Sequence, residues 1–174
     1  MADDGAMSSR GGYGDGEAQT RPLPFIDVHA IEVNAKPERA WRGVVSLVHN
    51  LGTGAPQWAL AAVLGATDRL TSGLRGMPGS TVPGFQVAVS DPPSVLILAG
   101  SHRFSTYELA FRVEPVGPSK SRVLAESRAL FPGHLGTAYR ALVIGSGGHS
   151  IAVKAMLRRI KRISEGSTPD PDYE

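Results

Sequence analysis

The sequence contains no cysteine in its 174 residues, which excludes disulfide bonds, thiol catalysis and thiolate metal sites. It also lacks an apolar run of the roughly 20 residues that a transmembrane helix needs, so we expect no stable membrane insertion. The first 22 residues have neither the basic start nor the apolar stretch of a secretion signal, and we expect a cytoplasmic protein. The five histidines follow no HExxH or paired spacing, so we expect no bound metal.

Charge is distributed unevenly along the chain. The net charge is only +2, but residues 1–21 and 165–174 contain eight of the 16 acidic residues and two of the 18 basic ones. Residues 22–164 therefore carry a formal charge of +8, which favours anionic partners. The densest basic stretch, Lys154 to Arg162, is most simply a solvated helix face; the alternative is a surface that contacts an acidic protein, a membrane or a nucleic acid. A homodimer is the other partner that we consider. Few aromatic residues lie among these charges, so we expect no nucleic-acid partner.

Glycine-rich and acidic segments mark both ends of the chain. We expect residues 1–22 to form a disordered N-terminal tail and residues 166–174 a disordered acidic tail, because neither has apolar periodicity. Residues 23–165 then form one domain, which is long enough for a single good core.

The first half of this domain predicts a strand and two short helices. Residues 25–33 alternate as a strand does. Pro37 suits the first position of a helix, and apolar residues recur after it at helical spacing. Residues 55–64 predict a second short helix, whereas residues 66–82 are too rich in glycine to assign.

Strands dominate the middle of the chain. Residues 85–90 and 95–99 predict a hairpin around a proline-containing turn, and residues 104–113 and 122–131 alternate in matching patterns. Apolar residues meet and charges neutralise if Val113 pairs with Val123, Phe111 with Ala125, Leu109 with Ser127, Tyr107 with Ala129 and, on the other face, Glu108 with Arg128.

The last third predicts one long helix with a single inward stripe. Spacings of three and four connect Leu135, Tyr139, Leu142, Ser146, His149, Val153, Met156, Ile160 and Ile163. Three glycines at 145, 147 and 148 each cost about 1 kcal/mol relative to alanine within a helix. We therefore expect a thin, bendable midpoint.

The glycine-rich stretch 141–150 also resembles a dinucleotide-binding turn. That interpretation requires a second strand about 20 residues further on with an acid for the ribose, and only a proline-containing tail follows Glu165. We expect no cofactor.

Several polar side chains accompany the apolar faces. His149 is either a hydrogen-bonded core residue or a proton-transfer group, and Tyr107 and Tyr139 are predicted to point inward. His102 lies at a strand start where a pocket could open. A second set is predicted to form ion pairs on the solvent side of the sheet, unless that face is the concave one: Glu108, Arg112, Glu126 and Arg128.

Two parts of the chain resemble a known superfamily: the strand that leads through Pro37 to Trp41, and the long closing helix through Met156 and Leu157. Residues 25–164 are similar to the START-like helix-grip (SRPBCC) superfamily of polyketide cyclases and aromatases, lipid carriers and plant allergen-type hormone binders. The stretches 102–108, 126–133 and 139–149 look like an uncharacterised branch. Lys36 departs from the small capping residue of many members. The resemblance implies a cavity between a curved sheet and the closing helix.

We therefore predict an α+β helix-grip domain: a curved antiparallel sheet of about six strands, two short helices after the first strand, and a long C-terminal helix. The predicted function is binding of a small hydrophobic or amphipathic molecule, such as a lipid, polyketide or aromatic metabolite. The alternative is a cyclase, dehydratase or hydrolase that uses polar groups of the same cavity. The predicted ligand-binding residues are Tyr107, Leu109, Phe111, Tyr139, Leu142, Ser146, His149 and Val153.

Overall fold

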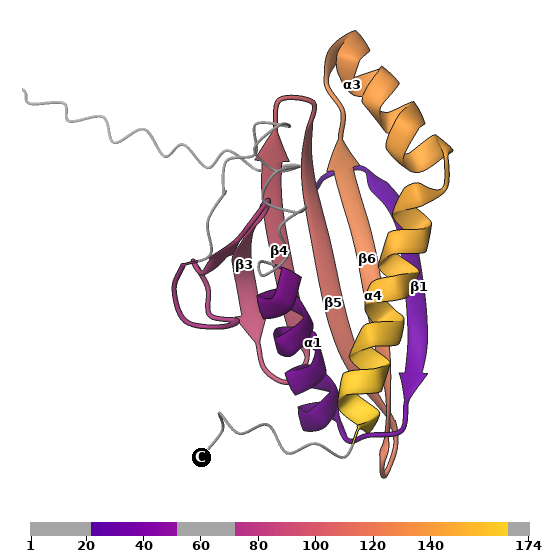
Figure 1. Cartoon of the computed structure of the whole chain (residues 1–174). Helices are drawn as coiled ribbons and strands as arrows, with labels where there is room; N and C mark the ends of the chain where they lie inside the picture. Colours follow the sequence, from indigo (N-terminus) through magenta and orange to yellow (C-terminus); the bar gives the residue numbers. More distant parts are fainter. Residues whose placement is uncertain (1–21, 52–71, 167–174) are drawn as a thin grey trace, which may run out of the picture.

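A computed structural model describes residues 22–51 and 72–166, which form a curved antiparallel sheet with helices on one face (Figure 1). The expected helix at residues 55–64 and nearly all of the two expected tails lie outside the described residues. The elements in chain order are β1 (Phe25–Val33), α1 (Pro37–Leu51), β2 (Thr81–Val82), β3 (Phe85–Asp91), β4 (Val95–His102), β5 (Ser105–Gly117), β6 (Lys120–Leu130), α3 (Gly133–Arg140), the π-helical segment η1 (Ala141–Gly145) and α4 (Gly148–Glu165).

The six strands pair in the order β1-β6-β5-β4-β3-β2. The predicted register of β5 and β6 is confirmed at every pair, from Val113 opposite Val123 to Tyr107 opposite Ala129. β1 pairs with the other side of β6, where Asp27 lies opposite Ser127 after a bulge at Ile26. This register places the polar residue Asp27 of β1 beside the polar residue Ser127 of β6.

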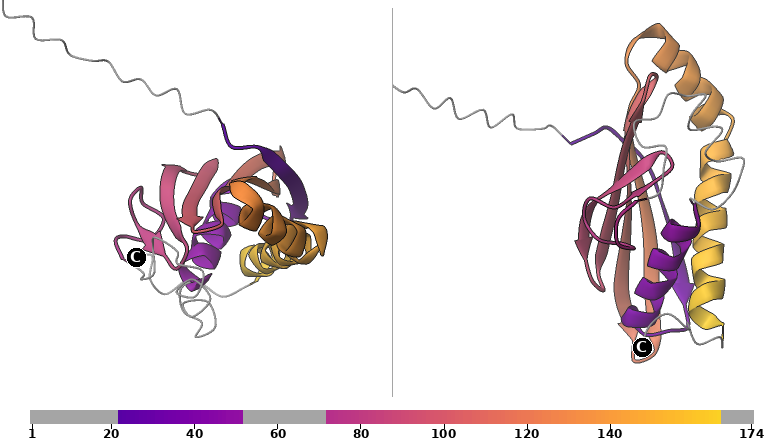
Figure 2. Two further views of the ribbon diagram at one scale, coloured as in Figure 1. Left: turned by 90° about the horizontal axis from the view of Figure 1, so that it is seen from above. Right: turned by 60° about the vertical axis from the view of Figure 1, so that its left-hand side comes forward.

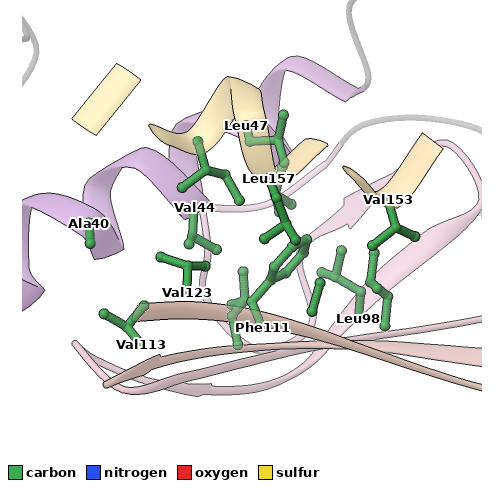
Figure 3. Packing of buried hydrophobic residues seen from close by; sticks show 14 of the residues in the cluster. Ala40, Val44, Leu47, Leu98, Phe111, Val113, Val123, Val153 and Leu157 are labelled. Atoms are coloured by element: carbon green, nitrogen blue, oxygen red, sulfur yellow. The ribbon is translucent and has the colours of Figure 1, made fainter. Parts of the chain in front are cut away.

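The core lies between the sheet and the two helices α1 and α4. Phe111 is fully buried at its centre, and Figure 3 shows Val44 and Leu47 of α1 and Leu157 of α4 facing it. Burial of each such side chain contributes about 1.5–3 kcal/mol, so this face of the sheet is held firmly against the helices.

Helices α1 and α4 pack closely because one residue at their crossing has no side chain. A Cβ atom on Gly43 would lie 3.2 Å from the carbonyl oxygen of Ile160 and would collide with the Ser164 hydroxyl. Both helices therefore cover the same face of the sheet, as the side view in Figure 2 shows.

The closing helix is interrupted, as its glycines predicted, but the prediction of one continuous inward stripe was wrong. Residues 141–145 form a π-helical turn, and Gly147 adopts a left-handed conformation with φ of 77° before α4 begins. A π turn accommodates an extra residue, so the side that faces the sheet shifts along the sequence. In Figure 1, α3 and α4 consequently meet at a bend near the upper ends of β6 and β1.

Candidate functional site

A cavity of about 220 Å³ lies between the sheet and the closing helical segments. The sheet contributes one wall, which includes Tyr107, Leu109, Ser127 and Ala129. The opposite wall comes from α3, η1 and α4, and it includes Tyr139, Val143, Ile144, His149, Val153 and Met156. Most of these side chains are apolar, so the space suits a hydrophobic molecule with few polar groups.

Five of the eight predicted ligand-binding residues line this cavity: Tyr107, Leu109, Tyr139, His149 and Val153. The structure places the other three elsewhere. Phe111 is fully buried in the core, Leu142 has 69% of its surface exposed, and Ser146 is also exposed.

The misplacement of Leu142 and Ser146 has one physical cause. The expected stripe assumes that a regular α-helix continues past Tyr139. The π turn at residues 141–145 accommodates an extra residue, which changes the residues that face the sheet. Val143 and Ile144 therefore point toward the sheet and line the cavity where Leu142 was expected. Four residues further on, the bend at Gly147 restores the predicted facing of His149 and Val153.

Aromatic rings gather at one end of the cavity, around His102. Its ring centroid lies 5.0 Å from that of Tyr139 and 5.5 Å from that of Tyr107, and Tyr139 also stacks on Phe104 at 5.7 Å. The backbone N–H of Phe104 donates to Nδ1 of His102, so Nε2 carries the proton of the neutral ring and donates to Ser105 Oγ at 3.2 Å. Burial lowers the pKa of His102, which favours this neutral form.

The two tyrosines of this end differ in how their hydroxyls are used. Tyr107 donates to the carbonyl oxygen of Gly84 at 2.7 Å. Tyr139 makes no hydrogen bond through its hydroxyl within residues 22–51 and 72–166, and burial raises its pKa. Tyr139 can therefore offer a proton donor to a molecule in the cavity.

A second polar group joins strand β1 to α4 at the other side of the cavity. His149 Nε2 lies 2.9 Å from Ser127 Oγ and 3.3 Å from Asp27 Oδ1. The second oxygen of the same carboxylate lies 3.2 Å from Nε2 of His29, which also contacts Ser150 Oγ at 3.1 Å. One carboxylate thus bridges two imidazoles.

Asp27 and Ser127 were not among the predicted site residues. The signals were present in the sequence: Asp27 shares a strand face with His29, and the predicted register already placed Ser127 beside Leu109. The alternation of residues along a strand could not predict that Asp27 lies opposite Ser127. That contact depends on the pairing of β1 with β6, which joins segments about 100 residues apart.

Of the four residues expected to form ion pairs on the outer face, only Glu126 and Arg128 pair among the described residues, and both lie in one strand. Arg128 Nε donates to Glu126 Oε1 at 2.6 Å, although Glu108 is the residue opposite Arg128 in the sheet. Strand alternation puts Glu126 and Arg128 on the face opposite Ser127 and Ala129, although Arg128 is also among the residues that line the cavity.

Two further observations concern metal ions and membranes. Among residues 22–51 and 72–166, no group of three or more histidine or acidic side chains is arranged to hold a metal ion. In the same part of the chain, no helix combines the length and apolarity needed to cross a bilayer.

The sheet, the closing helix and the cavity between them define the START-like helix-grip fold, and this chain has it. Among solved structures, norcoclaurine synthase from Thalictrum flavum in complex with dopamine and hydroxybenzaldehyde is similar with a TM-score of 0.56 at 14% identity, covering 97% of this chain and 100% of that one. CalU16 from Micromonospora echinospora matches with a TM-score of 0.50 at 12% identity, covering 83% and 76%. Protein MLL2253 from Mesorhizobium loti matches equally well, at 0.50 and 12%, covering 82% and 100%.

These identities are low, so the likeness concerns the fold. No protein-family profile matches the sequence, and a search of curated proteins finds no match.

Proposed function

We propose that this protein binds a small hydrophobic or amphipathic molecule, such as an aromatic metabolite, a polyketide or a lipid, in the cavity between sheet and closing helix. The observation that carries the proposal is the cavity itself, whose walls are mostly apolar. Its polar lining residues are His102, Ser105, Tyr107, Glu108, Ser127, Arg128, Tyr139 and His149. Such a lining holds an apolar body by burial and orients a few polar atoms by hydrogen bonds.

The cavity volume limits the size of the ligand. About 220 Å³ exceeds the about 150 Å³ of an apolar cavity that binds benzene, and it is smaller than the about 300–1,000 Å³ of sites for drug-sized ligands. One or two rings, or a chain of medium length, suit this space. The aromatic cluster around His102 favours rings, and the two small aromatic molecules bound to the similar norcoclaurine synthase agree with that choice.

A matched pair of substitutions tests the proposal. Ala152 and Ala155 are both exposed residues of α4, but only Ala152 lines the cavity. We expect fatty acids or aromatic aldehydes to raise the melting temperature of the wild type and of Ala155→Phe saturably. For Ala152→Phe, we expect the ligand concentration that gives half of this rise to be at least tenfold higher. Native mass spectrometry of the purified protein identifies any bound molecule by its mass. A response that Ala152→Phe leaves unchanged would place binding elsewhere.

The second candidate function is an enzyme of the cyclase, dehydratase or hydrolase type. The contact of His149 with the carboxylate of Asp27 favours it, because a carboxylate partner orients an imidazole for proton transfer. Unchanged turnover by His149→Ala, in a preparation of known activity, would remove His149 from such a reaction.

An acidic protein partner or a second copy of this chain stays a prediction, as does the cytoplasmic location. The acidic-partner prediction rests on the exposed basic side chains of α4, such as Arg158 and Arg162. Reversing both charges should abolish a salt-sensitive interaction and leave a hydrophobic one intact.

A further inference from the structure

The network of Asp27, His149 and Ser127 has the geometry of a positioned base rather than of a nucleophilic triad. In a Ser-His-Asp triad the serine and the carboxylate contact different nitrogens of the imidazole. Here Ser127 Oγ and Asp27 Oδ1 both contact the same atom, Nε2 of His149. Ser127 therefore lacks the histidine–carboxylate arrangement that activates a nucleophilic serine. Nδ1 of His149 contacts neither Ser127 nor Asp27.

The carboxylate decides which nitrogen of His149 carries the proton. An ionised carboxylate only accepts hydrogen bonds, so Nε2 of the neutral ring is protonated and Nδ1 holds the lone pair. Nδ1 makes no hydrogen bond within residues 22–51 and 72–166, yet every buried side-chain nitrogen or oxygen of these residues has a partner. Nδ1 is therefore accessible, in a side chain that lines the cavity.

An imidazolium at His149 would have the Asp27 carboxylate beside its Nε2 atom. The charged groups near it are Asp27 in direct contact, His29 through the same carboxylate, and Glu108 and Arg128, which also line the cavity. The side chains of Asp27 and His149 are 23% and 25% exposed, so water screens their attraction only in part.

We infer that His149 is the base of the cavity and accepts a proton at Nδ1 from a weakly acidic O–H group of the ligand, with Asp27 as the positioning residue. The ligand class is then a phenol or an enol. In the step, the ligand O–H bond breaks and an N–H bond forms at Nδ1, which leaves a phenolate or enolate beside an imidazolium that Asp27 neutralises. This inference rests on the proposed function, because the ligand has to occupy the cavity first.

The tautomer of His149 is testable without any ligand. Long-range nitrogen NMR of the imidazole should report the Nε2–H tautomer in the wild type, and Asp27→Asn should reduce the preference for it because an amide can donate as well as accept. An Nδ1–H tautomer in the wild type overturns the inference whatever the cavity binds.

The proton transfer is testable with 4-nitrophenol, whose ionised form absorbs visible light. Calorimetry measures binding and absorbance measures ionisation of the bound probe. We expect the ratio of phenolate to phenol to rise about three- to tenfold on binding at constant pH, and His149→Gln and Asp27→Asn to abolish most of the rise. The matched control His134→Gln changes an exposed histidine of α3 and should behave as the wild type.

The outcomes separate the two proposals. If 4-nitrophenol binds without a change in its ionisation, or if His149→Gln keeps the change, the inference is wrong and the proposed binding function stands. If fatty acids bind but 4-nitrophenol does not, the phenol class and the inference are wrong. If no probe binds, the proposed function fails, and the inference fails with it.

Discussion

Substituting Gly100 by alanine should deform the aromatic end of the cavity. A Cβ atom at this position would lie 2.6 Å from Cε2 of the Tyr107 ring and would collide with the carbonyl oxygen of Gly84, the same atom that accepts the Tyr107 hydrogen bond. Overpacking of this kind costs about 1–3 kcal/mol. Loss of the hydrogen bond adds about 1 kcal/mol, so we expect Gly100→Ala to lower the free energy of unfolding by about 2–4 kcal/mol.

Urea denaturation followed by tryptophan fluorescence measures this loss. For a chain of this size it corresponds to a fall in melting temperature of about 5–15 °C. The matched control is Gly145→Ala in η1, where the added Cβ meets nothing within 4 Å and should leave stability unchanged or raise it by up to about 1 kcal/mol. If Gly100→Ala stayed within about 0.5 kcal/mol of the wild type, the close approach of Tyr107 and Gly84 would not be a constraint on the fold.

Three other predictions concern Glu165, His102 and the phase of the closing helix. The backbone N–H of Asn34 lowers the pKa of Glu165 at the end of α4. The stabilisation from the Glu165 carboxylate is therefore present above its unfolded pKa and is lost as pH falls through its folded pKa. In urea denaturation, Glu165→Gln should be less stable than the wild type at pH 7 and equally stable in strong acid. Burial lowers the pKa of His102, so stability should fall as pH drops below 6.5, and His102→Gln should flatten this dependence in thermal melts between about pH 7 and 5. By urea denaturation, Leu157→Ala should cost about 2–5 kcal/mol and Leu142→Ala less than about 0.5 kcal/mol, whereas equal losses would contradict the shifted phase of the closing helix.

Most of the fold could be predicted because its signals are local. The limits of β1 and the start of α1 at Pro37 match the sequence pattern, since two-residue alternation and a proline at the first helical turn are properties of neighbouring residues. The register of β5 and β6 was also predictable because a short turn joins them and a slip by one residue would bury charges.

The site could be predicted only in part because it depends on helical phase and on distant pairing. Strand alternation predicted that Tyr107 and Leu109 face inward, and Tyr139 lies before the π turn, where the regular helical spacing still applies. The sequence pattern could therefore predict these three lining residues. Leu142 and Ser146 were not, because nothing in the spacing of apolar residues distinguishes a π turn from a regular one.

The amino-acid sequence by itself determined the order of the elements, the inner face of each main strand and the weak midpoint of the closing helix, because these depend on residues a few positions apart. Only the tertiary structure decided that Asp27, Ser127 and His149 meet, and that Val143 and Ile144 face the cavity. The physical reason is that the pairing of β1 with β6 and the packing of α4 on the sheet are contacts between remote segments, whose geometry no local pattern records.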